Sequence, residues 1–212
     1  MSNLTVTATY KGHPVITGET TNFQYNQRHL ENNLNLLETM VERHNKVLTF
    51  RMDIRLPQES TVNNPPRVIS SFMSSFTNNL SRKKLDPGYV VKMEQQISGN
   101  PHFHCQILVD GNKVKDYRPL VKTAESLLAK QLKLSQEDVQ GLIHYCGKNQ
   151  NGNPIKNGTM IRRNSTDYQD QFDAVYQQMS YLAKQKPGDA IPSSVRKVFY
   201  SRDKRKRSRS TC

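Results

Sequence analysis

The chain has 212 residues, enough for one domain with extensions, and its hydrophobic content of 34% supports one modest core. Its 31 Lys and Arg against 18 Asp and Glu leave a formal charge of +13, which favours a polyanionic partner, either nucleic acid or an acidic membrane surface. No apolar stretch is long enough to span a membrane, and the first residues lack the basic start and apolar run of a signal peptide. Three scattered cysteines exclude a disulfide framework and a Cys-rich zinc site, and suit a reducing cytosol.

The first part of the chain predicts a small hairpin, two helices and a strand. Residues 1–27 alternate around Lys11-Gly12 and indicate a peripheral hairpin. Residues 28–45 carry leucines at helical spacing, and residues 67–84 form a second amphipathic pattern. Between them, residues 46–56 alternate as a strand with one apolar and one polar face.

The second part predicts a strand hairpin followed by helices. The segments "YVVKMEQQI" (89–97) and "HFHCQILVDG" (102–111) indicate two strands joined by "SGNP". We expect a helix over 119–133, another capped by Ser135, a long hairpin or irregular loop over 146–160, and a last helix over 164–185. The basic tail, 201–212, is predicted to be disordered.

These elements predict an α+β domain over residues 28–200. Each central strand has one apolar face and one polar face, so we expect an antiparallel or mixed sheet with helices packed on one face and an open polar face on the other.

Two histidines one residue apart stand on the predicted polar face. His102 and His104 share that face because strand side chains alternate, and Glu94 of the preceding strand would lie beside them in a hairpin. Two histidines and a carboxylate are a metal-binding set, although such a pair on a surface strand can equally be polar decoration. A zinc protease is disfavoured because no His-Glu-x-x-His helix is present, and a cupin-type oxygenase because no Glu follows within the strand.

Tyr181 and Lys184 lie three residues apart on the last predicted helix and would therefore share a face. Taken alone, the pair can equally be a half-buried tyrosine with a solvated lysine.

Together these patterns resemble the HUH endonucleases, which nick single-stranded DNA. The segments "KVLTFRMDIRLP", "YVVKMEQQISGNPHFHCQILVDGN" and "FDAVYQQMSYLAK" are similar in order and spacing to motifs of inovirus replication initiators and of prophage proteins with a YagK/YfjJ-type C-terminal domain, over roughly residues 28–200. The resemblance implies an RNA-recognition-motif-like sheet and a sequence-specific nicking and joining enzyme that starts rolling-circle replication of a phage or plasmid.

The resemblance also implies roles for individual residues. Tyr181 would be the nucleophile that forms a 5′-phosphotyrosine, assisted by Lys184, and a divalent ion, Mg or Mn, would be held by His102, His104 and Glu94. Two-tyrosine initiators carry a Tyr-x-x-x-Tyr pair, whereas Tyr176 and Tyr181 are five apart, on divergent helix faces. The sequence therefore predicts one nucleophile, with Tyr176 in the core.

Basic side chains would supply DNA affinity. Arg51 and Arg55 project from the polar face of the first strand beside Asp53, which would support the metal site; an ordinary ion-pair ladder is the alternative. The other candidate DNA-binding residues are Lys92, Arg162, Arg163 and the tail residues Lys204, Arg205, Lys206 and Arg207.

The expected partners are single-stranded or supercoiled origin DNA and a host helicase, because the chain has no phosphate-binding loop of its own. The expected location is the cytoplasm of a bacterial host. Two alternatives remain open: a transposase or relaxase with the same chemistry, and a non-catalytic DNA-binding regulator on the same fold.

Overall fold

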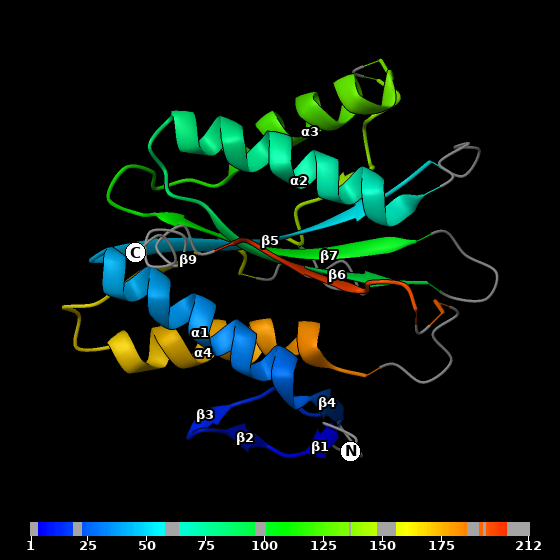
Figure 1. Cartoon of the computed structure of the whole chain (residues 1–212). Helices are drawn as coiled ribbons and strands as arrows, with labels where there is room; N and C mark the ends of the chain where they lie inside the picture. The colour runs from blue at the N-terminus through cyan, green and yellow to red at the C-terminus, as the bar shows by residue number, and fades with distance from the viewer. Residues whose placement is uncertain are drawn as a thin grey trace, which may run out of the picture.

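The computed structural model describes residues 4–18, 23–57, 64–95, 101–135, 137–147, 156–185, 191–192 and 194–202. Its centre is an open antiparallel sheet with strand order β10-β6-β7-β5-β8, in which β9 also pairs with β5 (Figure 1). The strands are β5 (Lys46–Arg55), β6 (Gly88–Glu94), β7 (His102–Asp110), β8 (Ile143–His144), β9 (Thr159–Arg162) and β10 (Val198–Tyr200). The predicted hairpin of β6 and β7 is confirmed, with Glu94 opposite His102 and Lys92 opposite His104.

Helices cover both faces of the sheet, so the prediction of helices on one face only is wrong. One face carries α2 (Pro65–Arg82) and α3 (Arg118–Leu132), and the other carries α1 (Gln27–Arg43) and α4 (Tyr168–Ser180) (Figure 1). The reason is that the face covered by α1 and α4, called the second face below, is polar along only part of its length. Val47, Val90 and Leu108 project from it at its other end, where they are fully buried in one cluster with residues of α1 and α4.

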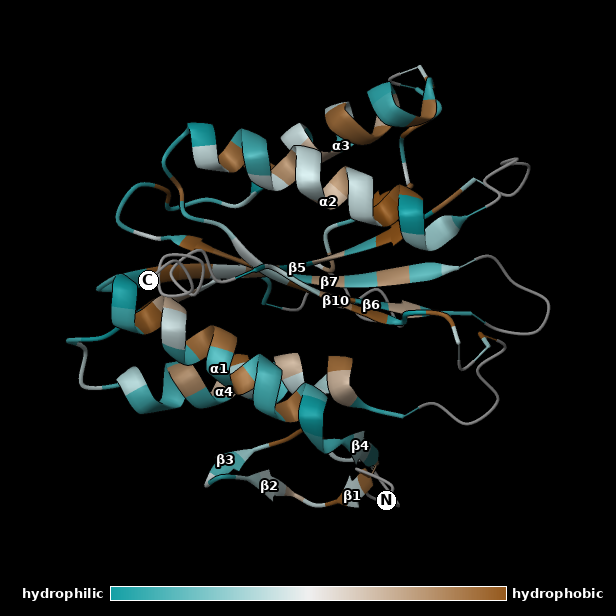
Figure 2. Cartoon of the chain, in the orientation of Figure 1, coloured by the Kyte–Doolittle hydropathy of each residue, from teal (hydrophilic) through white to brown (hydrophobic). Residues whose placement is uncertain are grey.

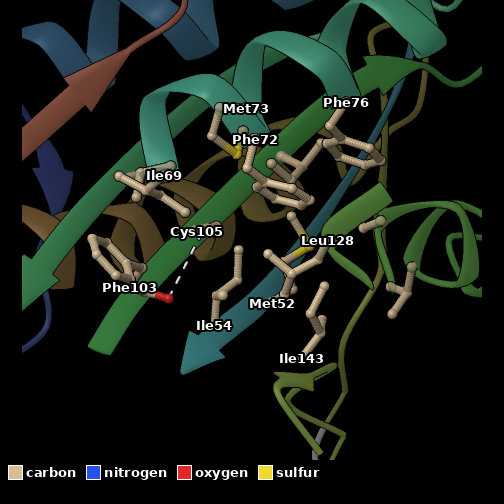
Figure 3. Close-up of a cluster of buried hydrophobic side chains, with 14 of the residues drawn as sticks. Met52, Ile54, Ile69, Phe72, Met73, Phe76, Phe103, Cys105, Leu128 and Ile143 are labelled. Atoms are coloured by element: carbon tan, nitrogen blue, oxygen red, sulfur yellow. Dashed lines mark hydrogen bonds between the residues drawn. The ribbon is translucent and has the colours of Figure 1, made fainter. Parts of the chain in front are cut away.

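The core beneath α2 and α3 follows the predicted alternation. Met52 and Ile54 of β5 and Phe103 and Cys105 of β7 meet Phe72 of α2, and each of these side chains is fully buried (Figure 3). The matching apolar stripes run along the inner sides of the helices (Figure 2).

Two of the three cysteines lie within the described residues. Cys105 and Cys146 are both buried free thiols, and burial raises the pKa of each. Both thiols therefore stay protonated at neutral pH.

Side-chain caps explain where α1 and α2 begin. The side chain of Asn26 caps α1 by accepting a hydrogen bond from the His29 amide, and Asn64 caps α2 in the same way at Arg67.

The helix predicted after Ser135 does not form. The Ser135 hydroxyl does accept from the Asp138 amide, but the described residues after it make turns. None of the helices in the described part of the chain combines the length and apolar character needed to cross a bilayer.

The predicted hairpin near the N-terminus is present as β2 (Thr9–Tyr10) and β3 (His13–Pro14). Lys11 and Gly12 both have positive φ, 50° and 85°, as a two-residue hairpin turn requires. Beside it, β1 (Leu4–Val6) pairs with β4 (Gln24–Asn26). The hairpin is tied to the helices, since the His13 ring and the Asp173 carboxylate of α4 lie 2.6 Å apart.

Candidate active site

The polar half of the second face is a grid of charged side chains set by strand register. One row runs Lys92, His104, Asp53 and His144 across β6, β7, β5 and β8. The next row runs Glu94, His102 and Arg55 across three of the same strands. Directly opposed residues in antiparallel strands project to the same side, so these residues share one surface.

His104 stands at the centre of the grid and contacts two carboxylates. Its Nδ1 lies 3.0 Å from Asp53 Oδ1 and its Nε2 lies 3.5 Å from Glu94 Oε2, and its side chain is only 13% exposed. Burial alone would lower the pKa of His104, but the hydrogen bonds to Asp53 and Glu94 outweigh burial and raise it. The imidazolium form, which donates from both ring nitrogens, is therefore more favoured than in a free histidine.

Each carboxylate also has a cation of its own. The Arg51 guanidinium reaches Asp53 through two hydrogen bonds of 2.9 and 3.0 Å, and Lys92 Nζ lies 2.7 Å from Glu94 Oε1. Burial would raise the pKa of both Asp53 and Glu94, but His104 and these cations hold each well below its ordinary range. We call these five residues, Arg51, Asp53, Lys92, Glu94 and His104, the charged cluster.

Tyr181 is brought to this cluster by the end of α4. The helix stops at Ser180 and a single 3-10 turn, η1 (Tyr181–Ala183), follows. The Tyr181 ring meets the His104 ring edge-on, with centroids 5.5 Å apart and planes at 83°. Arg51 Cζ lies 5.1 Å and Lys92 Nζ 5.6 Å from the centre of the Tyr181 ring, so two cations flank it.

The phenol is protonated at neutral pH in this state. Burial and the nearby Glu94 raise the pKa of Tyr181, and Arg51 opposes them only in part. Any reaction that uses its oxygen as a nucleophile must therefore remove the proton during or before attack.

Lys184 does not share a helix face with Tyr181, so that prediction is wrong. Because the chain leaves the helix at Ala183, Lys184 adopts an extended backbone with φ −61° and ψ 136°. Its Nζ lies 3.3 Å from the centre of the Phe23 ring and 5.8 Å from that of Tyr181. Lys184 is still near the tyrosine, but it arrives from the following segment.

That segment is held by the N-terminal part of the chain. Tyr25 forms a β-bridge with Lys184, and the Gln185 amide donates to the Gln24 carbonyl at 2.7 Å. Lys92 Nζ also donates to the Lys184 carbonyl at 2.7 Å. The N-terminal extension, predicted to be peripheral, thus supports the backbone next to Tyr181.

Tyr176 lies in the core, as predicted. Its side chain is fully buried, its hydroxyl donates to the Leu30 carbonyl at 3.3 Å, and burial raises its pKa strongly. Its distance in sequence from Tyr181 puts it on the packed side of α4, away from the charged cluster.

The histidine and carboxylate donors of the charged cluster are types that transition metal ions bind. Their arrangement in space matches a metal site less well. His104 Nε2 and Glu94 Oε2, 3.5 Å apart, are close enough for one ion with bonds of about 2.1 Å to touch both. His102 is the direct cross-strand neighbour of Glu94. Within the described part of the chain, however, no three His, Cys, Asp or Glu side chains are grouped as a metal site. An ion at His104 would also have to displace the proton on Nε2.

The remaining predicted DNA-binding residues lie apart from one another. Arg55 is exposed at the end of β5, at the edge of the grid. Arg162 is opposite Lys46 at the other end of the same strand, and Arg163 donates to the Val41 and Glu42 carbonyls at the C-terminal end of α1. Lys204, Arg205, Lys206 and Arg207 lie outside the described residues.

The sequence interpretation missed His144. It is an exposed residue of a two-residue strand, directly opposite Asp53 on the side away from His104. The run "LIHYCG" shows no strand alternation long enough to reveal it.

The model of the YagK/YfjJ C-terminal domain matches residues 5–196. The chain belongs to the YagK/YfjJ C-terminal domain family. The match begins at residue 5, so the family domain includes β4, whose Tyr25 pairs with Lys184 next to Tyr181 and which the resemblance in sequence had left aside. No curated protein sequence matches the chain significantly.

Proposed function

We propose that this protein nicks and rejoins single-stranded DNA through a covalent bond between Tyr181 and a 5′-phosphate, and so starts rolling-circle replication of a phage or plasmid. The observation that carries the proposal is the tyrosine ring edge-on to His104 with Arg51 and Lys92 beside it. A nucleophile surrounded by buried cations is suited to a phosphodiester, whose negative charge the cations would balance.

The reaction would exchange one phosphate ester for another. The Tyr181 oxygen attacks the phosphorus, its proton leaves to solvent or a neighbouring base, and a P–Oη bond forms. The P–O3′ bond breaks and the departing oxygen takes up a proton, which leaves a free 3′-hydroxyl as a primer. Because the ester bond energy is kept in the phosphotyrosine, a 3′-hydroxyl can later attack it and rejoin the strand.

The residues of the charged cluster would have separate roles. Arg51 and Lys92 would hold non-bridging phosphate oxygens, and Asp53 would orient the His104 ring beside Tyr181 through its contact with Nδ1. A bound Mg or Mn ion, for which His102, His104 and Glu94 are the candidate ligands, would polarise the phosphate as a Lewis acid.

The proposal is tested by incubating the protein with single-stranded and supercoiled DNA that carries candidate origin sequences, with Mn or Mg present. The expected product is a nick with protein attached to the 5′ end, and mass spectrometry should locate the phosphopeptide at Tyr181. Tyr181→Phe should abolish the adduct while DNA binding persists. Tyr176→Phe, a control at the buried tyrosine of the preceding helix α4, should keep most of the activity.

The outcomes separate this proposal from its rivals. An adduct at Tyr176, or at neither tyrosine, contradicts the assignment of the nucleophile. Metal-dependent DNA binding without any nick on every DNA tested would favour a regulator on the same fold.

A further inference from the structure

The edge of the sheet beside the charged cluster exposes an aromatic surface that the proposed chemistry does not use. Tyr145 follows β8 directly and its side chain is 49% exposed, which makes it one of three large hydrophobic residues exposed within the described part of the chain. The rings of His144 and Tyr145 lie nearly parallel, 5.9 Å apart at 26°. The other two exposed hydrophobic residues, Leu4 and Val6, belong to β1 and are not aromatic.

Several contacts hold Tyr145 in place although its ring is exposed. A Cβ atom on Gly147 would lie 2.7 Å from the Tyr145 ring, so the ring rests against the backbone of the turn that follows it. The Tyr145 carbonyl accepts a hydrogen bond from the Asn157 side chain, and Asn157 also bonds both the amide and the carbonyl of Arg51. These bonds fix the Tyr145 backbone relative to β5, and the ring lies against the following turn, which lowers the conformational entropy that Tyr145 loses on binding.

The surroundings of this surface favour an anionic ligand with a flat apolar part. His144 is directly opposite Asp53, so the aromatic pair lies one strand, about 5 Å, from the charged cluster. The exposed Arg55 lies next to β8, since its amide donates to the Leu142 carbonyl at 2.8 Å. The chain as a whole carries a formal charge of +13.

We infer that His144 and Tyr145 form a stacking platform for an unpaired base of single-stranded DNA, next to the phosphate held at Tyr181. Aromatic side chains beside a basic surface bind single strands because every base offers a π-face, whereas the faces of bases in a duplex are already stacked. The inference rests on the proposed function and adds to it a base-binding site.

The experiment measures binding of a short fluorescent oligonucleotide to the full-length protein, in the Tyr181→Phe background so that no nicking occurs. Tyr145→Ala should weaken binding at least about 5-fold, the lower end of the range for loss of one stacked base. Tyr145→Phe keeps the ring and should bind as the parent does. The chain contains no tryptophan, so Tyr145→Trp introduces a single reporter whose fluorescence single-stranded DNA should quench.

A set of oligonucleotides with one abasic position each completes the test. One abasic position should weaken binding to the parent as much as Tyr145→Ala does, and should cost the Tyr145→Ala protein nothing further. Three results would each overturn the inference. They are affinity losses from Tyr145→Ala and from an abasic site that add strictly at every position, an unchanged affinity of Tyr145→Ala for the oligonucleotide, and a Tyr145→Trp fluorescence that DNA does not quench. If the parent does not bind single-stranded DNA at all, the proposed function itself fails. If the parent binds it and the Tyr145 substitutions leave the affinity unchanged, only the stacking platform is overturned.

Discussion

Lys92 is expected to be among the most stabilising side chains of the charged cluster. Its side chain is 7% exposed, and its ammonium group contacts Glu94, whose side chain is 5% exposed, and the Lys184 carbonyl, both at 2.7 Å. Lys92→Met removes the closest ionic partner of a buried carboxylate and one hydrogen bond. Breaking a buried pair from one side costs about 3–5 kcal/mol of unfolding free energy. Urea denaturation at pH 7 would measure this loss.

The chain offers a matched control for this experiment. Lys113 also contacts one carboxylate, Asp110, and one backbone carbonyl, that of Lys84, but its side chain is 48% exposed. Lys113→Met should cost less than about 1 kcal/mol, because water replaces an exposed cation readily. A similar loss in both lysine variants would refute the argument that burial sets the cost.

A double variant and a pH series distinguish two causes of the stability loss in Lys92→Met, namely the unpaired charge of Glu94 and the loss of packing. Lys92→Met with Glu94→Gln should cost clearly less than Lys92→Met alone, leaving about 1 kcal/mol for the hydrogen bond to Lys184. The folded-state pKa of Glu94 is depressed, so its stabilisation is present above about pH 4 and is lost as the pH falls through the folded pKa. The deficit of Lys92→Met should therefore shrink below about pH 4. A deficit that is constant with pH, or a double variant no more stable than the single one, would contradict the reasoning.

Two other predictions concern protonation and DNA affinity. Asp53→Asn removes a carboxylate that raises the pKa of His104, so an NMR titration of the imidazole should show a lower pKa than in the parent; an unchanged or higher value would contradict the assigned contact. The raised pKa also means that His104 stabilises the fold below its unfolded pKa of about 6.5 and stops doing so as the pH rises through the folded value, and Asp53→Asn should reduce this dependence. Deletion of residues 201–212, with their cluster of Lys and Arg, should weaken binding to single-stranded DNA and flatten its salt dependence, by about 0.7 in slope for each phosphate that the tail neutralises in the parent. An unaltered salt slope would remove the tail from the DNA-binding surface.

The strands could be predicted from the sequence because their signal is local. Side chains alternate along a strand whatever its neighbours are, so the apolar face of β5 and the shared face of His102 and His104 follow from residue spacing alone. Because only a short segment joins β6 and β7, the sequence predicts a hairpin with Glu94 near the two histidines, whereas the register that sets Glu94 opposite His102 comes from the structure. The five-residue separation of Tyr176 and Tyr181 likewise decides that the two rings leave the helix in different directions.

Other features of the site depend on contacts between distant segments. The end of α4 at Ser180 was not predictable from helical spacing, because strand pairing of Gln24 and Tyr25 with the segment after the helix competes with further helical turns. This pairing takes Lys184 out of the helix and leaves it near Tyr181 by another route.

The sequence by itself determined the alternating strands, the order of the elements, the excess of positive charge and a histidine pair beside an acidic residue. Only the tertiary structure decided that helices cover both sheet faces, that Lys92 and Arg51 flank Tyr181, and that His144 lies beside Asp53. The physical reason is the range of the interactions. Backbone geometry repeats every two or 3.6 residues and depends on neighbouring residues, whereas burial and strand register join residues far apart in the sequence, such as Asp53 and His144, and their free energy depends on the whole packed chain.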